Sequence, residues 1–185
     1  GGQFANIPET SLSCGIAGAA LMDLAIRGKI DCDLTSLWAV DTAPTDSEML
    51  NRVLADIAAE PQHLPARTWI ERLTPQALHL RDEALRKLCE RGILREDDHV
   101  FLWVLKARKY PVEKSVERLE GKRRILALLF NQEIPDPEDI ALIAMADACS
   151  IFERILTPST LREAAPRIRQ LSRMDLIGAQ IAHTA

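Results

Sequence analysis

EDIALIAMADACSIFERIL, residues Glu138–Leu156, is the stretch around which the rest of the chain is organised. Between Ile140 and Phe152 only Asp147 and Ser150 are polar, and apolar side chains fall on every face of a 3.6-residue period. A helix that is apolar all round must be covered by other elements or by lipid. The run is too short and too rich in alanine for a membrane span, which needs about 20 consecutive apolar residues. We therefore predict that it forms the central hydrophobic helix of a mainly α, helical globule.

Helical spacing of apolar residues predicts the other helices, at 9–29, 48–60, 66–73, 74–91, 114–131 and 159–183. The apolar face of the 74–91 helix is expected to include Leu78 and Leu85, and Phe130 of the 114–131 helix is expected to face inward. Asp46 or Ser47 is expected to cap the 48–60 helix, and Pro166 is expected to break the last helix. Two segments depart from this spacing. Ile30–Val40 is rich in β-formers and predicts a short strand pair, and 93–112 predicts a protruding β-hairpin.

Composition points to one folded domain spanning residues 1–185. With 47% hydrophobic and only 4% aromatic residues, the chain can bury a core of Leu, Ile, Ala and Val. The four cysteines form no C-x-x-C pair and are predicted to be reduced thiols of a cytoplasmic protein, although a disulfide or zinc role stays open. No signal peptide or membrane span is expected, because Leu12–Met22 lacks a basic leader and Asp23 interrupts it.

Charge is distributed unevenly along the chain. The net charge is −4, yet residues 65–132 hold 15 Lys or Arg against 10 Asp or Glu. The excess lies in Lys106–Arg124, with eight basic and three acidic residues. A run of this kind is either a solvated helix face or a surface for an anionic partner such as membrane phosphates. Beside it, six successive apolar residues (100–105) belong either to a doubly buried strand or to a hairpin with an apolar outer face.

The sequence carries no recognisable catalytic or metal motif. There is no Gly-rich phosphate loop, no H-E-x-x-H and no G-x-S-x-G. His79 with Asp82 is expected to be a surface contact, and Asp97–His99 a solvated loop. Asp147 is the best single candidate for a functional carboxylate, but an Arg partner from another helix is the commoner arrangement for a buried Asp. We predict no enzyme, no cofactor, no metal site and no nucleic-acid partner.

Several motifs, in order along nearly the whole chain, resemble the Golgi phosphoprotein 3 family. They are LMDLAIRGKI (21–30), DTAPTDSEML (41–50), TWIERL (68–73), LCERGIL (88–94), VFLWVL with YPV (100–112), and ALIAMADACSIFERIL (141–156). Each is weak alone, whereas the ordered set is fairly specific. The family's first strand-and-helix segment has no counterpart here.

The resemblance implies a mostly helical domain with a central hydrophobic helix and a hairpin at 93–112 that supports oligomerisation and touches the bilayer. It also implies a peripheral membrane adaptor that binds phosphatidylinositol 4-phosphate and the cytosolic tails of membrane proteins. The expected membrane or oligomer contacts of the hairpin are Phe101, Trp103, Leu105, Lys106, Arg108 and Lys109.

The phosphoinositide pocket implied by the resemblance is largely replaced. The family's Trp position falls near Pro8 and its first Arg falls on Ala17. Of a later basic pair three residues apart, the first falls on Leu78, and only Arg81 is kept as a headgroup ligand. A phosphate monoester is held by several convergent charge-assisted hydrogen bonds, so one Arg predicts weak stereospecific recognition. The departure indicates a divergent member of the family, and a prokaryotic origin is one explanation.

The sequence therefore supports two alternative hypotheses for the function. One is a peripheral adaptor attached to the cytosolic face of a membrane by the hairpin and a basic surface. The other is a soluble oligomeric scaffold that binds protein only, with the hairpin as a subunit interface. Binding to anionic vesicles separates the two hypotheses.

Overall fold

The computed structural model shows a mainly α fold, 70% helical, with one short antiparallel strand pair. It describes residues 9–94, 115–131 and 135–177, and only the backbone of 115–122. Within these ranges the helices are α1 (Glu9–Ile26), α2 (Glu48–Ala59), α3 (Ala66–Leu73), α4 (Ala77–Glu90), α5 (Ser115–Phe130), α6 (Pro137–Ala148), α7 (Phe152–Ile155) and α8 (Pro158–Ser172). A 3₁₀ turn, η1 (Thr74–Gln76), precedes α4.

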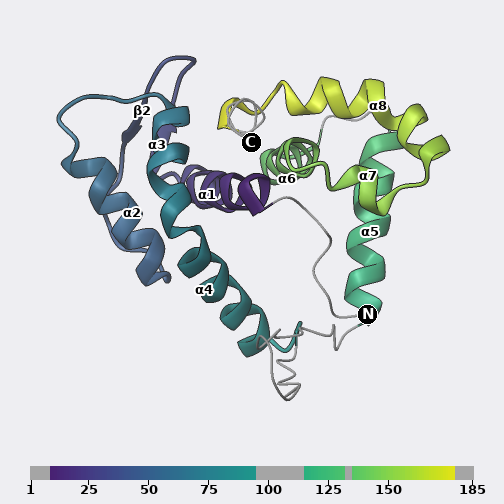
Figure 1. Ribbon diagram of the computed structural model, residues 1–185, viewed down its shortest axis with the longest axis horizontal. Helices are drawn as coiled ribbons and strands as arrows, with labels where there is room; N and C mark the ends of the chain where they lie inside the picture. The colour runs from purple at the N-terminus through teal and green to yellow at the C-terminus, as the bar shows by residue number, and fades with distance from the viewer. Residues whose placement is uncertain (1–8, 95–114, 132–134, 178–185) are drawn as a thin grey trace.

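Helix α6 lies between α1 on one side and α5, α7 and α8 on the other (Figure 1). It contributes residues to two parts of the hydrophobic core. Ala141 and Ala144 belong to the core shared with α1, α2 and α3, whereas Ile143 and Ala146 belong to the core shared with α5, α7 and α8. A helix buried on two sides needs apolar residues around most of its circumference. The prediction of a central hydrophobic helix is therefore confirmed.

The start of α6 follows from its sequence. Asp136 is the N-cap, and its side chain accepts a hydrogen bond from the Asp139 backbone N–H at 2.9 Å. Pro137 occupies the first turn, where a missing N–H costs nothing, and Glu138 places negative charge at the positive end of the helix.

The end of α6 comes earlier than predicted. The helix closes at Ala148, and a new short helix, α7, begins at Phe152. Between them Ser150 has a positive φ of 54°, a conformation that L-residues rarely adopt. The predicted continuous helix over Glu138–Leu156 is therefore wrong beyond Ala148. The bend lets Phe152, 2% exposed, enter the core beside α8.

Helix α1 packs against α2, α3, α4 and α6 and is a second organising element. Its small residues allow close approach: a Cβ built on Gly15 would lie only 2.3 Å from the Cys149 Sγ. Of the described helices, α1 alone is long and apolar enough to cross a membrane by length and composition. Eight of its residues are buried within the fold, as in the core helix of a globular domain.

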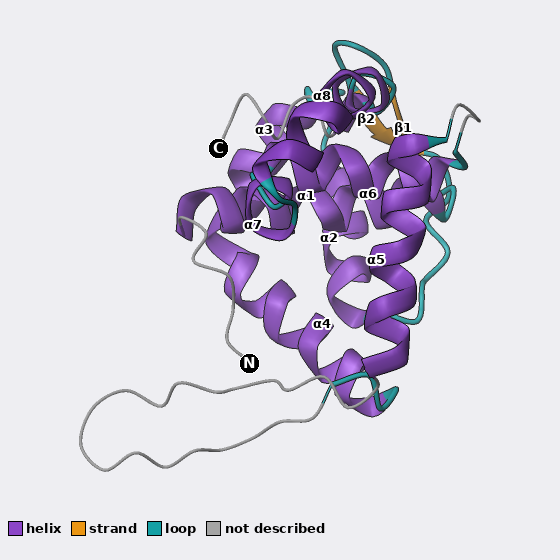
Figure 2. Cartoon of the chain, turned by 90° about the vertical axis from the view of Figure 1, so that its right-hand side faces the viewer, coloured by secondary structure: helices purple, strands orange, loops and turns teal. Residues whose placement is uncertain are grey.

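The strand pair occupies one end of the molecule and α4 extends toward the other (Figure 2). Strands β1 (Ile30–Cys32) and β2 (Leu37–Ala39) pair antiparallel, with Ile30 opposite Ala39. This confirms the strand pair predicted within Ile30–Val40. The second predicted hairpin, at 93–112, lies almost wholly outside the described residues.

Three smaller predictions are corrected by burial and continuity. Leu78 is 48% exposed, because the buried face of α4 is formed by Ala77, Leu80 and Leu85 instead. Helix α8 continues through Pro166, whose exposed position leaves the carbonyl freed by its missing N–H accessible to water. Phe130, predicted to face inward, is 47% exposed at the end of α5.

Candidate ligand-binding groove

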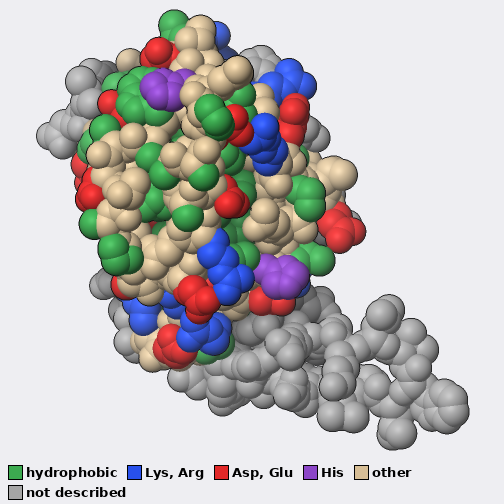
Figure 3. Space-filling view, turned by 90° about the vertical axis from the view of Figure 1, so that its left-hand side faces the viewer, with side chains coloured by type: hydrophobic (Ala, Val, Ile, Leu, Met, Phe, Trp, Pro, Cys, Tyr) green, Lys and Arg blue, Asp and Glu red, His purple; other side chains and the backbone are tan. Residues whose placement is uncertain are grey.

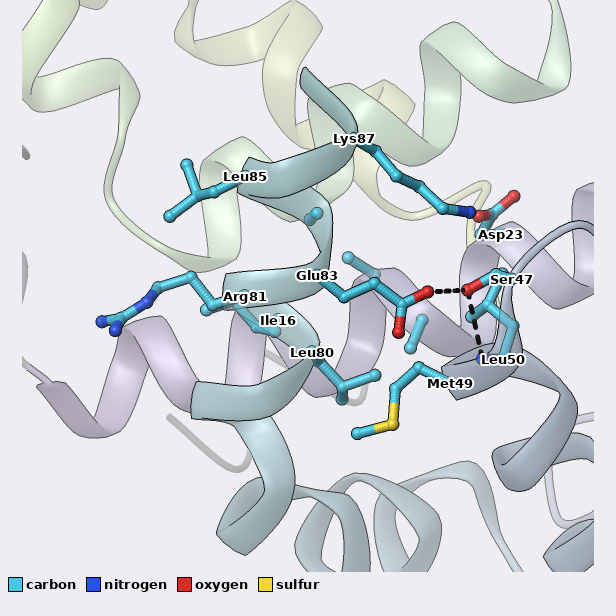
Figure 4. Close-up of a pocket in the computed structure, with 13 residues that line it drawn as sticks. Ile16, Asp23, Ser47, Met49, Leu50, Leu80, Arg81, Glu83, Leu85 and Lys87 are labelled. Atoms are coloured by element: carbon cyan, nitrogen blue, oxygen red, sulfur yellow. Dashed lines mark hydrogen bonds between the residues drawn. The ribbon is translucent and has the colours of Figure 1, made fainter. Parts of the chain in front are cut away.

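A hollow of about 290 Å³ lies between α1, α2 and α4, and we name it the α1–α4 groove. Its walls are mostly apolar (Figure 4), and its lining residues are Ile16, Ala19, Ala20, Asp23, Ser47, Met49, Leu50, Leu80, Arg81, Glu83, Ala84, Leu85 and Lys87. Small side chains on α1 (Ala19, Ala20) and α4 (Ala84) leave the space open. Ligand sites in proteins are typically concave and apolar, with a few positioned polar groups.

One carboxylate of the groove is held in a defined orientation. The hydroxyl of Ser47, which is 5% exposed, donates a hydrogen bond to Glu83 Oε1 at 2.6 Å. Ser47 is also the N-cap of α2 and accepts from the Leu50 backbone N–H at 3.3 Å. The same hydroxyl thus joins α2 to α4. In Figure 4 the second oxygen of Glu83 points away from Ser47, toward Met49.

The rim of the groove carries an ion-pair network. Arg27 Nε lies 2.7 Å from Asp23 Oδ1, and Arg27 Nη1 lies 2.7 Å from Asp46 Oδ1. Lys87 Nζ donates a hydrogen bond to the Asp46 carbonyl oxygen at 3.3 Å. The Arg27 and Lys87 charges hold the pKa of the Asp46 carboxyl below its ordinary value, with Arg27 the larger influence. These pairs tie the end of α1 to the start of α2 and to α4.

Arg81, the predicted headgroup ligand, lines one edge of the groove. Its guanidinium points away from Glu83 (Figure 4) and makes an ion pair with the neighbouring Asp82 at 3.1 Å. Leu78, one helical turn earlier, is exposed as described above. Ala17, on the position of the family's first Arg, is 0% exposed and belongs to the core. Among these three positions, only Arg81 offers a cation at the surface.

Asp147 does not lie in a buried site. It is exposed and accepts a hydrogen bond from the Ser172 hydroxyl at 2.9 Å, so the predicted burial with an Arg partner is wrong. The buried acid of α6 is Asp139, 7% exposed, and Arg124 of α5 lies 2.9 Å from it. The hydrogen bond to Asp139 raises the pKa of the Arg124 guanidinium. Arg124, the last residue of the basic run, is therefore engaged within the fold.

The remaining sequence candidates do not assemble into a reaction centre. The described parts of the chain hold no group of three or more His, Cys, Asp or Glu side chains that could bind a metal ion. Cys14 and Cys149 are buried, and burial raises the pKa of the Cys149 thiol. Asp97–His99 and the hairpin residues Phe101, Trp103, Leu105, Lys106, Arg108 and Lys109 lie outside the described residues.

A second hollow lies between α1 and α6 and shares the lining residues Ala19 and Asp23 with the first. It is lined by Met22, Ile26, Leu142 and Met145 and rimmed by Asp23 and Glu138, with no fixed polar group like Ser47–Glu83 among its described lining residues. The sequence offers Asp46 or Ser47 as the cap of α2, and the structure shows Ser47 in this role, but no sequence signal marks Glu83, whose partner lies 36 residues away.

The described residues define a helical domain with an apolar hollow and positioned charges at its edge. The chain belongs to the Golgi phosphoprotein 3 (GPP34) family, whose family model matches residues 2–185. That is nearly the whole chain, so the resemblance seen in the ordered motifs is confirmed. The family is not an enzyme family, and its members are peripheral proteins associated with the Golgi and the cytosol.

Proposed function

We propose that this protein is a peripheral membrane adaptor that attaches to anionic lipid surfaces mainly by charge and by an apolar hairpin. The observation that carries the proposal is the family match over residues 2–185. The sequence adds a basic excess within Lys106–Arg124, next to the apolar run 100–105. Each Lys or Arg near an anionic bilayer contributes about 1 kcal/mol, so a few such residues suffice for reversible attachment.

The proposed attachment is electrostatic rather than stereospecific. Arg81 is paired with Asp82, Leu78 is apolar, and Ala17 is buried. Specific recognition of a phosphate monoester needs several donors converging on it. We therefore assign Arg81 a supporting role, and the main contacts to Trp103 and to the basic residues Lys106, Arg108 and Lys109. Phe101 and Leu105 would accompany Trp103 in the bilayer or at an oligomer interface.

The described surface also supports the alternative of a soluble oligomeric scaffold that binds protein tails. On the face shown in Figure 3, over α2, α3 and α4, Lys and Arg side chains lie beside Asp and Glu, and hydrophobic side chains reach the surface between them. A face of mixed charge does not by itself attract a bilayer, whereas it suits contacts with protein. This alternative predicts a stable oligomer in sedimentation experiments and no association with vesicles.

Vesicle flotation tests the proposal. The full chain is mixed with neutral vesicles, with anionic vesicles, and with vesicles of equal charge that contain phosphatidylinositol 4-phosphate, at low and moderate salt. The expected result is equal, salt-sensitive flotation with both anionic preparations. Loss of flotation in Trp103→Ala, or after charge reversal at Lys106, Arg108 and Lys109, supports the hairpin as the contact. Flotation unchanged by these substitutions, or absent from the start, overturns the proposal.

A further inference from the structure

Among the described residues, the ion-pair network of the α1–α4 groove gives no cation to one carboxylate of the groove, that of Glu83. Around the rim, Arg27 pairs with Asp23 and Asp46, Lys87 pairs with Asp46, and Arg81 pairs with Asp82. Glu83 lies among them, and within the described part of the chain its side chain has one hydrogen-bond partner, the Ser47 hydroxyl. A hydroxyl is neutral, so no ion pair among the described residues compensates the negative charge of Glu83.

The position of Glu83 makes this charge useful to a ligand. Ser47 is buried and fixed by its role as N-cap of α2, so it holds one carboxylate oxygen in place. The other oxygen points along the apolar wall toward Met49 (Figure 4). A carboxylate beside an apolar surface loses part of its hydration. A cationic donor compensates for this lost hydration by forming a short, strong hydrogen bond with the carboxylate.

The chemistry of the groove selects among ligand classes. An anionic ligand would be repelled by Glu83, and a purely apolar one would cover its second oxygen without giving it a donor. A cation carried on an apolar chain satisfies both the carboxylate and the walls formed by Ile16, Leu50 and Leu80. The volume of about 290 Å³ lies at the lower end of ligand pockets, so the chain must be short.

We propose that the α1–α4 groove binds a primary ammonium on a short alkyl chain, with the ammonium donating to Glu83 and the chain lying between α1, α2 and α4. A free alkylamine and a lysine side chain both supply this chemistry. The proposal rests on Glu83 and Ser47, and not on Arg81 or the hairpin residues assigned to membrane attachment, so its test is independent of vesicle binding.

Binding by the full chain is measured by calorimetry and by saturation-transfer NMR with three probes of equal length: hexylammonium, hexanol and hexanoate. The expected order is hexylammonium first, with at least about tenfold tighter binding than hexanol, and hexanoate last, since only the first pairs with a carboxylate. Nα-acetyl-lysine methylamide forms a fourth arm. Tighter binding of this probe than of hexylammonium assigns the site to lysine side chains, and the reverse order assigns it to free amines.

Three variants locate the site. Glu83→Gln keeps an acceptor for Ser47 but removes the charge, and should reduce hexylammonium binding to the level of hexanol. Ala84→Leu fills the groove from an exposed helical position, so it should weaken both probes while the protein stays folded. Glu90→Gln is the matched control, because Glu90 lies on the same helix, pairs with Arg86 and does not line the groove. Equal binding of hexylammonium and hexanol, no saturable binding, or binding unaffected by Glu83→Gln and Ala84→Leu overturns the proposal.

Discussion

Gly15 and Cys149 bring α1 and the end of α6 into direct contact. The Cys149 Sγ occupies the place of a missing side chain, since a Cβ on Gly15 would lie 2.3 Å from it. The same sulfur donates a weak hydrogen bond to the Ser11 carbonyl oxygen at 3.7 Å. Cys149 is 4% exposed and cannot move into solvent without opening the interface.

Gly15→Ala should therefore destabilise the fold, although alanine is the better helix former. Alanine gains about 1 kcal/mol in a helix interior, whereas overpacking a filled core costs about 1–3 kcal/mol. The expected net loss is about 1 kcal/mol of unfolding free energy, measured by urea denaturation. In a double-mutant cycle, Gly15→Ala should cost less when Cys149 is also changed to Ala, because the sulfur is gone. Additive effects would show that the two residues do not compete for the same space.

Ser47→Ala should be the most damaging of the conservative changes in the groove. It removes the N-cap of α2 and the hydroxyl that orients Glu83, with an expected loss of about 1–2 kcal/mol in thermal or urea denaturation. Thr157→Ala is a suitable comparison, because Thr157 caps α8 by the same type of hydrogen bond. Thr157 is exposed, however, and in the described structure its side chain forms no hydrogen bond to a second helix. A loss no larger than that of Thr157→Ala would contradict the bridging role of Ser47.

Local signals in the sequence were sufficient for most helix starts and for the strand pair. Caps such as Ser47 and Asp136 act through hydrogen bonds within three residues, and Gly28 and Gly92 adopt the positive φ that glycine favours after a helix. Neither glycine nor proline marks the break at Ser150, so the sequence does not predict it. There, burial of Phe152 decides the backbone conformation, and such tertiary effects override local preference.

The groove could not be predicted from the sequence, because it too depends on tertiary packing. Glu83 is oriented by the Ser47 hydroxyl, and Asp139 is paired with Arg124. Both contacts join different helices, so they depend on tertiary packing. Asp147 was expected to be buried because its helix is apolar, yet it faces solvent beside Ser172. Apolar periodicity finds a buried helix, but it does not say which polar residue of that helix is covered.

Acid should weaken the strand pair and the loop that follows it. Thr35 and Ser36 donate three hydrogen bonds to Asp33 Oδ1, and Lys29 pairs with Asp41. The hydrogen bond from the Thr35 backbone N–H, first among these influences, lowers the pKa of the Asp33 carboxyl. The hydrogen bond from Lys29 lowers that of Asp41.

A folded-state pKa below the unfolded value of about 3.9 gives stability that is present above that pH and lost as the pH falls through the lowered pKa. Unfolding free energies measured between about pH 6 and pH 2 should therefore fall at the acid end, and the fall should be shallower in Asp33→Asn/Asp41→Asn. Parallel acid limbs in wild type and the double variant would exclude these two carboxylates as its source.

Loss of the Arg124–Asp139 ion pair should reduce stability more than loss of another, exposed cation of α5. Arg124→Ala leaves Asp139 buried without its cation, and Asp136 loses a weaker contact at 3.5 Å. Removing one partner of a buried charge is more damaging than removing an exposed ion pair. The urea midpoint of Arg124→Ala should lie below that of Arg123→Ala, the adjacent exposed residue with the same charge change. Equal midpoints would mean that Asp139 finds compensation from solvent.

Leu78→Arg should increase binding to vesicles that contain phosphatidylinositol 4-phosphate. Leu78 is 48% exposed and precedes Arg81 by one helical turn, so an arginine there would bring a second cation to the same surface without disturbing the core. Two arginines can hold a phosphate where one, already paired with Asp82, holds it weakly. Ala17 offers no such route, because it is fully buried.

Leu34→Arg is the control for this change. Leu34 is 82% exposed in the turn between β1 and β2, so this substitution adds the same charge far from Arg81. Flotation with phosphoinositide vesicles should rise for Leu78→Arg and exceed that of Leu34→Arg, at equal total vesicle charge. An equal rise in both variants would show that only net charge matters. The α4 surface would then have no residual preference for the phosphate headgroup, and attachment would depend on the basic run alone.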